Sequence, residues 1–257
     1  MSAVDIMTLL VPVTYLAFLG LEALAPARKF PPARGWRWLG VGFLILNGLV
    51  QVVTPLLIPA QWLARHRLLD LTGLGVGWGA VVGYGVLSFV SYVWHRSAHH
   101  FPLMWRSFHQ IHHSPQRVDM SGSQLFHPLE MLVFAAMGVA ITTLVLGLDP
   151  LAAAVTGYVA AFYGMFQHLN LKTPQWLGVI IQRPEAHCLH HGRGVHAWNY
   201  ADLPVWDMIF GSWRNPKAFE GEVGFDAPAD RRLGAMLAFA DVNAPINGPG
   251  SLGRAKT

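Results

Sequence analysis

The sequence contains few charged residues. Asp, Glu, Lys and Arg make up only 12% of its 257 residues, and 53% are hydrophobic, whereas ordinary globular chains carry about 25% charged residues. The net charge of +4 is small, and the basic residues of the sequence lie in short segments. Neither feature indicates a nucleic-acid binder. This composition predicts a membrane protein, long enough for one large domain or two small ones.

Cysteine and several common motifs are also scarce or absent. The single cysteine, Cys188, excludes an internal disulfide framework and cysteine-rich zinc sites. There is no H-E-x-x-H motif, which excludes the commonest zinc-protease pattern, and no serine nucleophile elbow or phosphate-binding loop. No cytochrome or flavin motif is present, so a redox reaction would need electrons from outside the chain.

Long apolar stretches account for the low charge. They cover residues 6–25, 38–60, 72–94, 129–147 and 151–167. The first three are long enough to cross a hydrocarbon core of about 30 Å as helices. The last two are shorter and are joined by the turn signal Asp149-Pro150, which predicts a hairpin that crosses the bilayer or dips partway into it. The first stretch lacks a positive n-region and a clear cleavage site, so we expect a retained span and not a signal peptide.

A basic loop between the first two stretches predicts the orientation. It contains Arg28, Lys29, Arg34 and Arg37, and basic loops tend to stay in the cytoplasm. Alternation of the spans then places residues 95–128 and 168–257 on the same side. The sequence thus predicts an all-α integral membrane protein of a bacterial inner membrane. We expect about four to five membrane-embedded helices and a cytoplasmic, histidine-rich helical cap.

Three parts follow from this pattern. Residues 1–94 are expected to form the N-terminal spans, residues 95–213 a histidine-rich region that includes the hairpin 129–167, and residues 214–257 a polar tail. The end of the tail, NGPGSLGRAKT, is rich in small and polar residues and is expected to be disordered.

Histidine is the residue that the sequence has in excess. Nine of its thirteen histidines fall in three clusters, His95-x3-His99-His100, His109-x2-His112-His113 and His187-x2-His190-His191. Helix positions three and four apart share a face, so we expect His95 and His99 to point the same way, and likewise the three members of each other cluster. Imidazole is a common metal ligand, and the number of candidates is enough for two ions. Imidazole binds iron, zinc, copper and nickel alike, so the ligand type does not identify the metal.

The order of these clusters resembles the fatty acid hydroxylase/sterol desaturase superfamily of integral-membrane di-iron enzymes. The resemblance covers roughly residues 92–213. It rests on HRSAHHFPLMWRSFHQIHHS (95–114), FHPLE (126–130), QHLNL (167–171) and EAHCLHHGRGVHAWNYADLPVWDMIFGSW (185–213). The last segment is similar to a family ending in which a histidine box is followed by Asn-Tyr and then by Trp-Asp and Phe-Gly.

The resemblance implies a set of metal ligands and no catalytic residue beyond them. The implied ligands are His95, His99, His109, His112, His113, His168, His187, His190 and His191. Further candidates, as ligands or as groups that orient the ligands, are His100, His127, His196, Asn199 and Asp207. Glu130 and Glu185 lie near the ligand positions in the sequence and are also candidates to accept hydrogen bonds from ligand imidazoles.

The function implied by the resemblance is hydroxylation or desaturation of a lipid. It would use two iron ions, O2 as co-substrate and an external electron donor of the ferredoxin- or cytochrome-type reductase kind. The substrate would be sterol-like, a fatty acyl chain or a lipid head group. A metal-handling membrane protein or transporter is the alternative, but the histidines follow the ends of the spans and not their middles. A zinc hydrolase would need fewer ligands.

Two roles are open for Arg96, which directly follows His95 in the sequence. Its side chain could reach a lipid phosphate, or it could pair with an acidic residue.

Overall fold

The structure is a computed structural model that describes residues 1–243, so the tail segment expected to be disordered lies outside the described residues. Within that range the chain is helical. It contains no strand there, and only one isolated β-bridge joins Gly192 and Val223. The predicted all-α class is confirmed.

Long apolar helices form a bundle. They are α1 (Ala3–Leu24), α2 (Trp36–Leu56), α4 (Gly75–His100), α7 (Pro128–Val139) with its π-helical continuation η4 (Ala140–Val145), and α8 (Pro150–Phe166). Four stretches are long and apolar enough to cross a membrane, at residues 3–24, 36–56, 72–100 and 128–145. The helix α8 is shorter, with 17 residues or about 25 Å. These helices confirm the expectation of four to five membrane-embedded helices.

Local sequence signals explain several helix ends. Ser2 and Asp5 form a reciprocal capping box at the start of α1. Asp149 accepts hydrogen bonds from the backbone of Leu151 and Ala152, so the predicted turn also begins α8. The helix α2 ends at Leu56 and not at residue 60, and Pro59, which has no backbone N–H to donate, precedes the short α3 (Ala60–His66).

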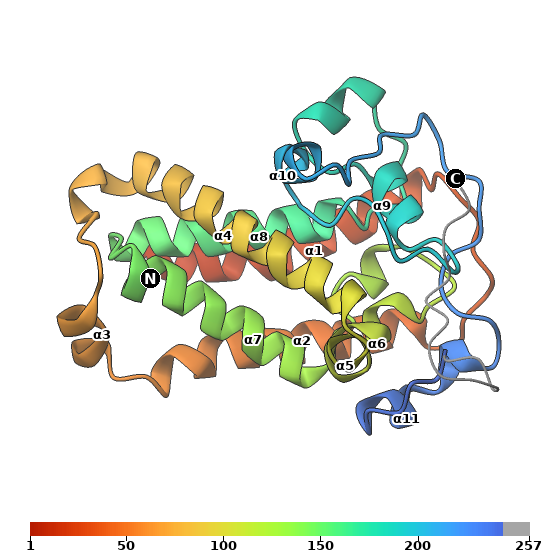
Figure 1. Ribbon diagram of the computed structural model, residues 1–257, viewed down its shortest axis with the longest axis horizontal. Coiled ribbons are helices and arrows are strands. Elements are labelled where there is room, and N and C mark those ends of the chain that lie inside the picture. Colours follow the sequence, from red (N-terminus) through yellow and green to blue (C-terminus); the bar gives the residue numbers. More distant parts are fainter. Residues whose placement is uncertain (244–257) are drawn as a thin grey trace.

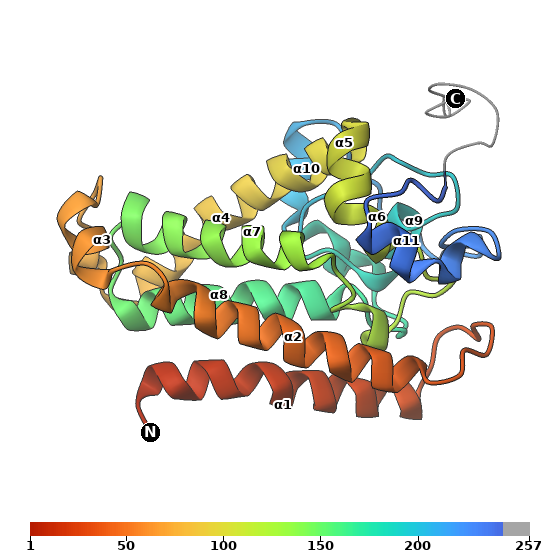
Figure 2. The ribbon, with the colours of Figure 1, turned by 90° about the horizontal axis from the view of Figure 1, so that it is seen from below.

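The bundle is organised around α8, which packs against both α4 and α1, while α2 packs against α7. Figures 1 and 2 show these helices running side by side along the long axis of the molecule. Close approach of α4 to α8 depends on Gly79 and Gly83. A Cβ atom at Gly83 would lie 2.5 Å from Thr156 Oγ1 and 2.8 Å from Leu148 Cδ1. This is the small-residue spacing that allows membrane helices to pack closely.

The outer faces of the bundle are apolar and exposed. Large hydrophobic side chains such as Leu16, Ile45, Leu49 and Val81 lie open on the surface. An apolar surface this extensive suits lipid and not water. Together with the length of the helices, it supports an integral membrane protein.

Short helices gather at one end of the bundle (Figures 1 and 2). They are α5 (Pro102–Met104), η2 (Trp105–His109), α6 (Gln110–His113), η3 (Met120–Gly122), η5 (Gln175–Val179), α9 (Pro184–His190), α10 (Pro204–Ile209), η6 (Ala229–Arg231) and α11 (Leu233–Leu237). We call residues 101–127 and 167–243 the histidine cap. At the other end lie α3 and η1 (Thr72–Leu74).

The basic loop lies at the same end as the histidine cap. The backbone N–H of Arg28 donates to Asn170 Oδ1 at 2.9 Å, and its guanidinium donates to the carbonyl of Gly221 at 2.7 Å. Alternation of the spans predicts this shared side.

The described part of the polar tail, residues 214–243, packs against the rest of the histidine cap. Phe225, Met236 and Val242 form a buried cluster with Trp105 and Ile111. The division at residues 94 and 213 stays a prediction.

Candidate metal centre

Four separate parts of the chain supply the nine histidines. The helix α4 continues past residue 94, so His95 and His99 lie on its last two turns. The π-helical η2 ends at His109, and α6 carries His112 and His113. His168 follows the end of α8, and α9 carries His187 and His190, with His191 directly after it.

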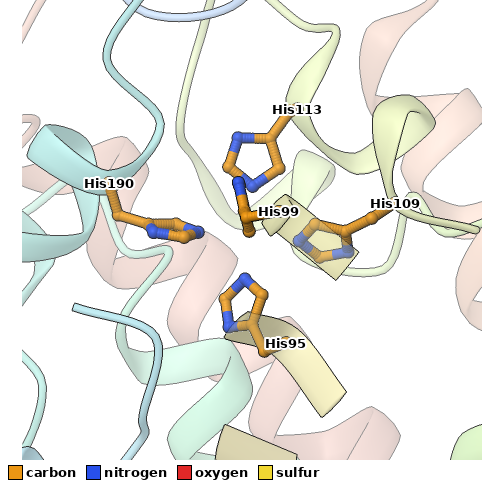
Figure 3. Close-up of side chains that lie close together, drawn as sticks. All are labelled: His95, His99, His109, His113 and His190. Atoms are coloured by element: carbon orange, nitrogen blue, oxygen red, sulfur yellow. The ribbon is translucent and has the colours of Figure 1, made fainter. Parts of the chain in front are cut away.

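Five of these rings form one group. His95, His99, His109, His113 and His190 each offer a nitrogen, and these nitrogens all lie within 4.8 Å of one another. Figure 3 shows the five rings arranged around a common point. We call this the five-histidine group.

The other four rings form a second group. His112, His168, His187 and His191 also bring their nitrogens within 4.8 Å of one another. The Nε2 atom of His168 lies 3.1 Å from those of His112 and His187, and His187 Nε2 lies 3.0 Å from His191 Nε2. We call this the four-histidine group. The two groups adjoin, since the rings of His113 and His191 stack with centroids 4.0 Å apart.

The expectation that each H-x2-H-H cluster shares one face is wrong. His109 and His113 belong to the five-histidine group while His112 belongs to the other; His187 and His191 stay together while His190 crosses over. An α-helix turns by about 100° per residue, so positions i and i+4 differ by about 40°, whereas neighbouring positions i+3 and i+4 differ by about 100°. Each cluster therefore contributes to both groups.

Outer contacts orient several rings through their Nδ1 atoms. His109 Nδ1 lies 2.9 Å from the fully buried Glu130 carboxylate. His95, His190 and His168 lie 2.6, 2.9 and 2.7 Å from the carbonyls of Tyr200, Trp198 and Gly164. A carbonyl accepts only from an N–H, so these contacts place the proton on Nδ1 and leave the Nε2 lone pair directed into the group.

Strained backbone aims one of these carbonyls. Trp198 and Asn199 have φ angles of +68° and +57°, a left-handed conformation that a bulky residue rarely adopts. The Asn199 side chain stabilises the bend, because its Nδ2 donates to the carbonyl of Ala186 and its Oδ1 accepts from the N–H of Arg214.

Burial favours the neutral form of several of these rings. Burial lowers the pKa of His168 to about 4 and that of His190 to about 3. Burial, reinforced by the neighbouring histidines, holds the pKa of His112, His113, His187 and His191 well below the usual value. Neutral imidazole is the form that binds a metal ion.

Many of the buried ring nitrogens have no hydrogen-bond partner among the described residues. They include Nε2 of His95, His99, His109, His113 and His190, all directed into the five-histidine group. Buried polar atoms are nearly always satisfied, so nitrogens left without a partner on this scale suit a metal ion.

The contacts in the four-histidine group cannot all be hydrogen bonds. A neutral imidazole has one donor and one acceptor nitrogen. His168 Nε2 must accept, since its Nδ1 donates to Gly164, so His187 Nε2 would have to donate to it. His187 Nε2 then has no lone pair left for His191. Nitrogens this close together that cannot all be hydrogen-bonded suit the ligands of one metal ion.

The further candidates lie outside both groups. His100 is exposed at the end of α4. His127 is buried and caps α7, accepting from the N–H of Leu129 at 3.1 Å. His196 packs beside Trp105 with ring centroids 4.5 Å apart, and 5.7 Å from His99.

Asp207 and the two glutamates differ in what they touch. Asp207 is fully buried and accepts from the N–H groups of Tyr200 and Ala201 and from Ser212 Oγ, so it fixes the carbonyl that holds His95. Glu130 contacts a ring directly, whereas Glu185 accepts from Thr173 and touches none. The carbonyls of Gly164, Trp198 and Tyr200 were not foreseen, because residue type carries no signal for a backbone acceptor.

The comparisons with known proteins agree with this site. The family model described as "Fatty acid hydroxylase" matches residues 80–212, just over half of the chain. The chain belongs to the fatty acid hydroxylase family. The resemblance noted from the histidine clusters is thereby confirmed, and the matched segment holds all nine histidines of the two groups.

Two curated relatives of this fatty acid hydroxylase family member are lipid hydroxylases. The ornithine lipid hydroxylase OlsE of Rhizobium tropici is 32% identical over 163 residues, which cover 62% of this chain and 49% of that protein. The sphingolipid C4-hydroxylase sur2 of Schizosaccharomyces pombe is 24% identical over 131 residues, or 49% of this chain and 45% of that one. The chain thus spans about half the length of these relatives. No solved structure matches it significantly.

Proposed function

We propose that the protein is a membrane-bound di-iron oxygenase that hydroxylates a lipid. The observation that carries the proposal is the pair of adjoining histidine groups. The inward Nε2 atoms of the five-histidine group have no hydrogen-bond partner among the described residues, and the close Nε2 contacts of the four-histidine group cannot all be hydrogen bonds. Both named relatives are hydroxylases, which favours hydroxylation over desaturation.

The residues fit two metal ions. The five-histidine group would hold one and the four-histidine group the other, each through ring nitrogens alone. Iron in both groups would supply the O2-dependent oxidation of an unactivated C–H bond. Glu130 and the carbonyls of Tyr200, Trp198 and Gly164 keep the protons of their rings on Nδ1. These contacts preserve the inward lone pairs that ligation needs.

The reaction needs an external reductant. Hydroxylation places one oxygen atom of O2 in the substrate and reduces the other to water, which consumes two electrons and two protons. No cytochrome or flavin motif supplies them, so we propose a ferredoxin- or cytochrome-type donor that docks on the histidine cap.

The membrane provides the substrate. The apolar outer faces of the bundle place the protein among lipids, and a lipid could reach the cap end without leaving the bilayer. The basic loop lies at that same end, and the positive-inside rule then supports a cap in the cytoplasm, at a bacterial inner membrane.

The alternative of a metal transporter is less well supported. Transport sites lie near the bilayer midplane, whereas both histidine groups lie at one end of the bundle. A zinc hydrolase would leave most of the nine imidazoles without a role.

The test combines metal analysis with isotope labelling. Protein purified from iron-replete cells should contain two iron ions per chain. Lipids extracted from a strain that lacks the protein are then incubated with the purified protein, a reductant and ¹⁸O2. One of them should gain a single ¹⁸O atom, and the product should match a lipid found in the strain that has the protein. Zinc alone, without an O2-dependent product, would contradict the proposal.

A further inference from the structure

A cavity of about 500 Å³ opens beside the five-histidine group. Its polar lining includes Arg96, His99 and Tyr200, and its apolar lining includes Val93, Phe101 and Phe210. Since His99 belongs to the five-histidine group, the cavity reaches the proposed metal site. Its volume lies in the usual range for a small-molecule pocket.

Arg96 brings an unpaired positive charge to this cavity. The side chain is exposed and makes no ion pair with any residue in 1–243. Its Nη1 donates to the Tyr92 hydroxyl at 2.6 Å, and that hydroxyl also contacts Ser212 Oγ at 3.2 Å. The guanidinium is therefore anchored at one nitrogen while its other donors stay free. Such a fork suits a carboxylate or a phosphate.

The rim of the cavity is apolar. Val93, Phe101 and Phe210 are 46%, 52% and 48% exposed, and Ile209 beside them is 62% exposed. Val93 belongs to the part of α4 that is long and apolar enough to cross the membrane. Because the apolar rim continues the lipid-facing surface, a lipid could enter sideways from the leaflet on the cap side.

The order of residues along α4 says which part of the lipid would reach the histidines. Arg96 and His99 are helix neighbours, with Cβ atoms about 5–6 Å apart. His99 lies about 4.5 Å further along the helix toward the cap. A lipid in that leaflet directs its headgroup toward the cap and its chains toward the bilayer centre. The carbons near the headgroup, and not the far end of a chain, then come level with His99.

We propose that Arg96 binds the anionic headgroup of the lipid substrate and that the oxidised C–H bond lies on or next to that headgroup. This inference rests on the proposed function and adds to it a substrate class, a specificity-determining residue and a position of attack.

The first test measures binding without turnover. The full-length protein in neutral detergent, at mildly alkaline pH, is titrated calorimetrically with N-dodecanoylglycine and with its neutral primary amide. The anion should bind about tenfold to a hundredfold more tightly, as expected for hydrogen bonds to a charged group. Arg96→Gln should abolish this difference while leaving binding of the amide unchanged, and Arg96→Lys should retain part of it.

Arg106→Gln is the matched control. Arg106 is also exposed and close to the end of α4, but it does not line the cavity, so its loss should leave the preference intact. Equal binding of the two probes to the wild type, or a preference that survives Arg96→Gln, would overturn the inference. An equal loss of the preference for the anion in both arginine variants would also overturn the inference, because it would show that the probe is attracted to the charged surface in general.

The second test locates the new hydroxyl group. Fragmentation mass spectrometry of the ¹⁸O-labelled product should place the label on the headgroup or on the adjoining carbons, and a label near the end of a chain would overturn the inference. Arg96→Gln should raise KM for that substrate with little change in kcat. A charge preference in binding without any hydroxylation would contradict only the proposed function, whereas hydroxylation without the preference would contradict only this inference.

Discussion

The two histidine groups are built differently. In the five-histidine group, three rings hold outer partners through Nδ1, namely the Glu130 carboxylate and the carbonyls of Tyr200 and Trp198. In the four-histidine group only His168 has such a partner within residues 1–243, and the Nε2 atoms of the rings instead lie 3.0–3.1 Å apart. The first group also borders a cavity through His99, and its His95 is half-buried, whereas all four members of the second group are buried.

This difference suggests that the two histidine groups keep their shape in different ways. A group fixed from outside by several segments keeps its shape while one side stays open to a substrate. A group held mainly by its own close packing would depend on the proposed ion between its rings. We therefore expect substitutions in the surroundings to affect the five-histidine group more, and loss of any one ring to disrupt the four-histidine group.

Loss of one ring from the four-histidine group should have the largest effect. His112→Ala removes one of four nitrogens, so bound iron should fall from two ions toward one and activity should fall by at least about a hundredfold, beyond the usual effect of outer partners. Metal analysis and product formation measure both. His66→Ala is the control, because His66 is exposed at the other end of the bundle. Full activity of His112→Ala would remove His112 from the site.

Glu130→Gln tests the five-histidine group specifically. The amide oxygen is a weaker acceptor for His109 Nδ1 than the carboxylate, and loss of such contacts typically costs 10–100-fold in metal affinity or activity. Iron should be lost first from one site and retained in the other, as followed by chelator titration. Glu222→Gln, at a 77% exposed side chain, should behave as wild type. Equal loss from both sites would mean that the groups are not independent.

Acidification should lower the folding stability of the metal-free protein through both histidine groups. The folded-state pKa of His168 is about 4 and that of His190 about 3, below the value of about 6.5 expected in the unfolded chain. The unfolded chain thus binds more protons between these values, so the stability contribution is complete above about pH 6.5 and decreases as the pH falls toward 4. Denaturation of the metal-free protein across this range should show the decrease; constant stability would contradict the buried, neutral state.

Asp207→Asn should have a moderate effect through His95. The asparagine loses one of the acceptor oxygens that hold the Tyr200 and Ala201 N–H groups and Ser212, and an unsatisfied buried group costs about 1–3 kcal/mol. The melting temperature should fall, and iron in the five-histidine group should become easier to remove. Asp226→Asn, at an 80% exposed side chain, provides the comparison. An unchanged melting temperature would show that Asp207 does not fix this loop.

Gly83→Ala should have the smallest effect on the site, since it acts through helix packing. The helix α4 carries His95 and His99, and His168 follows α8, so their contact sets the spacing of the two groups. An added Cβ meets Thr156 and Leu148, and overpacking costs about 1–3 kcal/mol. Gly85→Ala is the matched control on the same helix, because nothing lies within 4 Å of its Cβ. Equal melting temperatures for the two variants would exclude this close contact.

The sequence predicts much of the fold because the membrane simplifies the rules. A long apolar run with few charges has to become a helix, since lipid offers no partner for backbone polar groups. The runs near residues 6–25 and 72–94 could be located for this reason, and the Asp149-Pro150 turn separated the last two helices. Four of the five runs became helices long enough to cross, and the last, α8, is shorter.

The spacing of the three clusters pointed to eight of the nine grouped histidines, together with His100, and the family resemblance added His168. The sequence could not divide them into two groups. His112 and His113 are neighbours in the chain, yet the helix directs them to different groups, and the partner rings of His112 all come from segments more than fifty residues away. Only the tertiary structure decided that division, the carbonyls that orient the rings, and the position of Arg96 at a cavity beside His99, because each depends on how distant backbone segments meet.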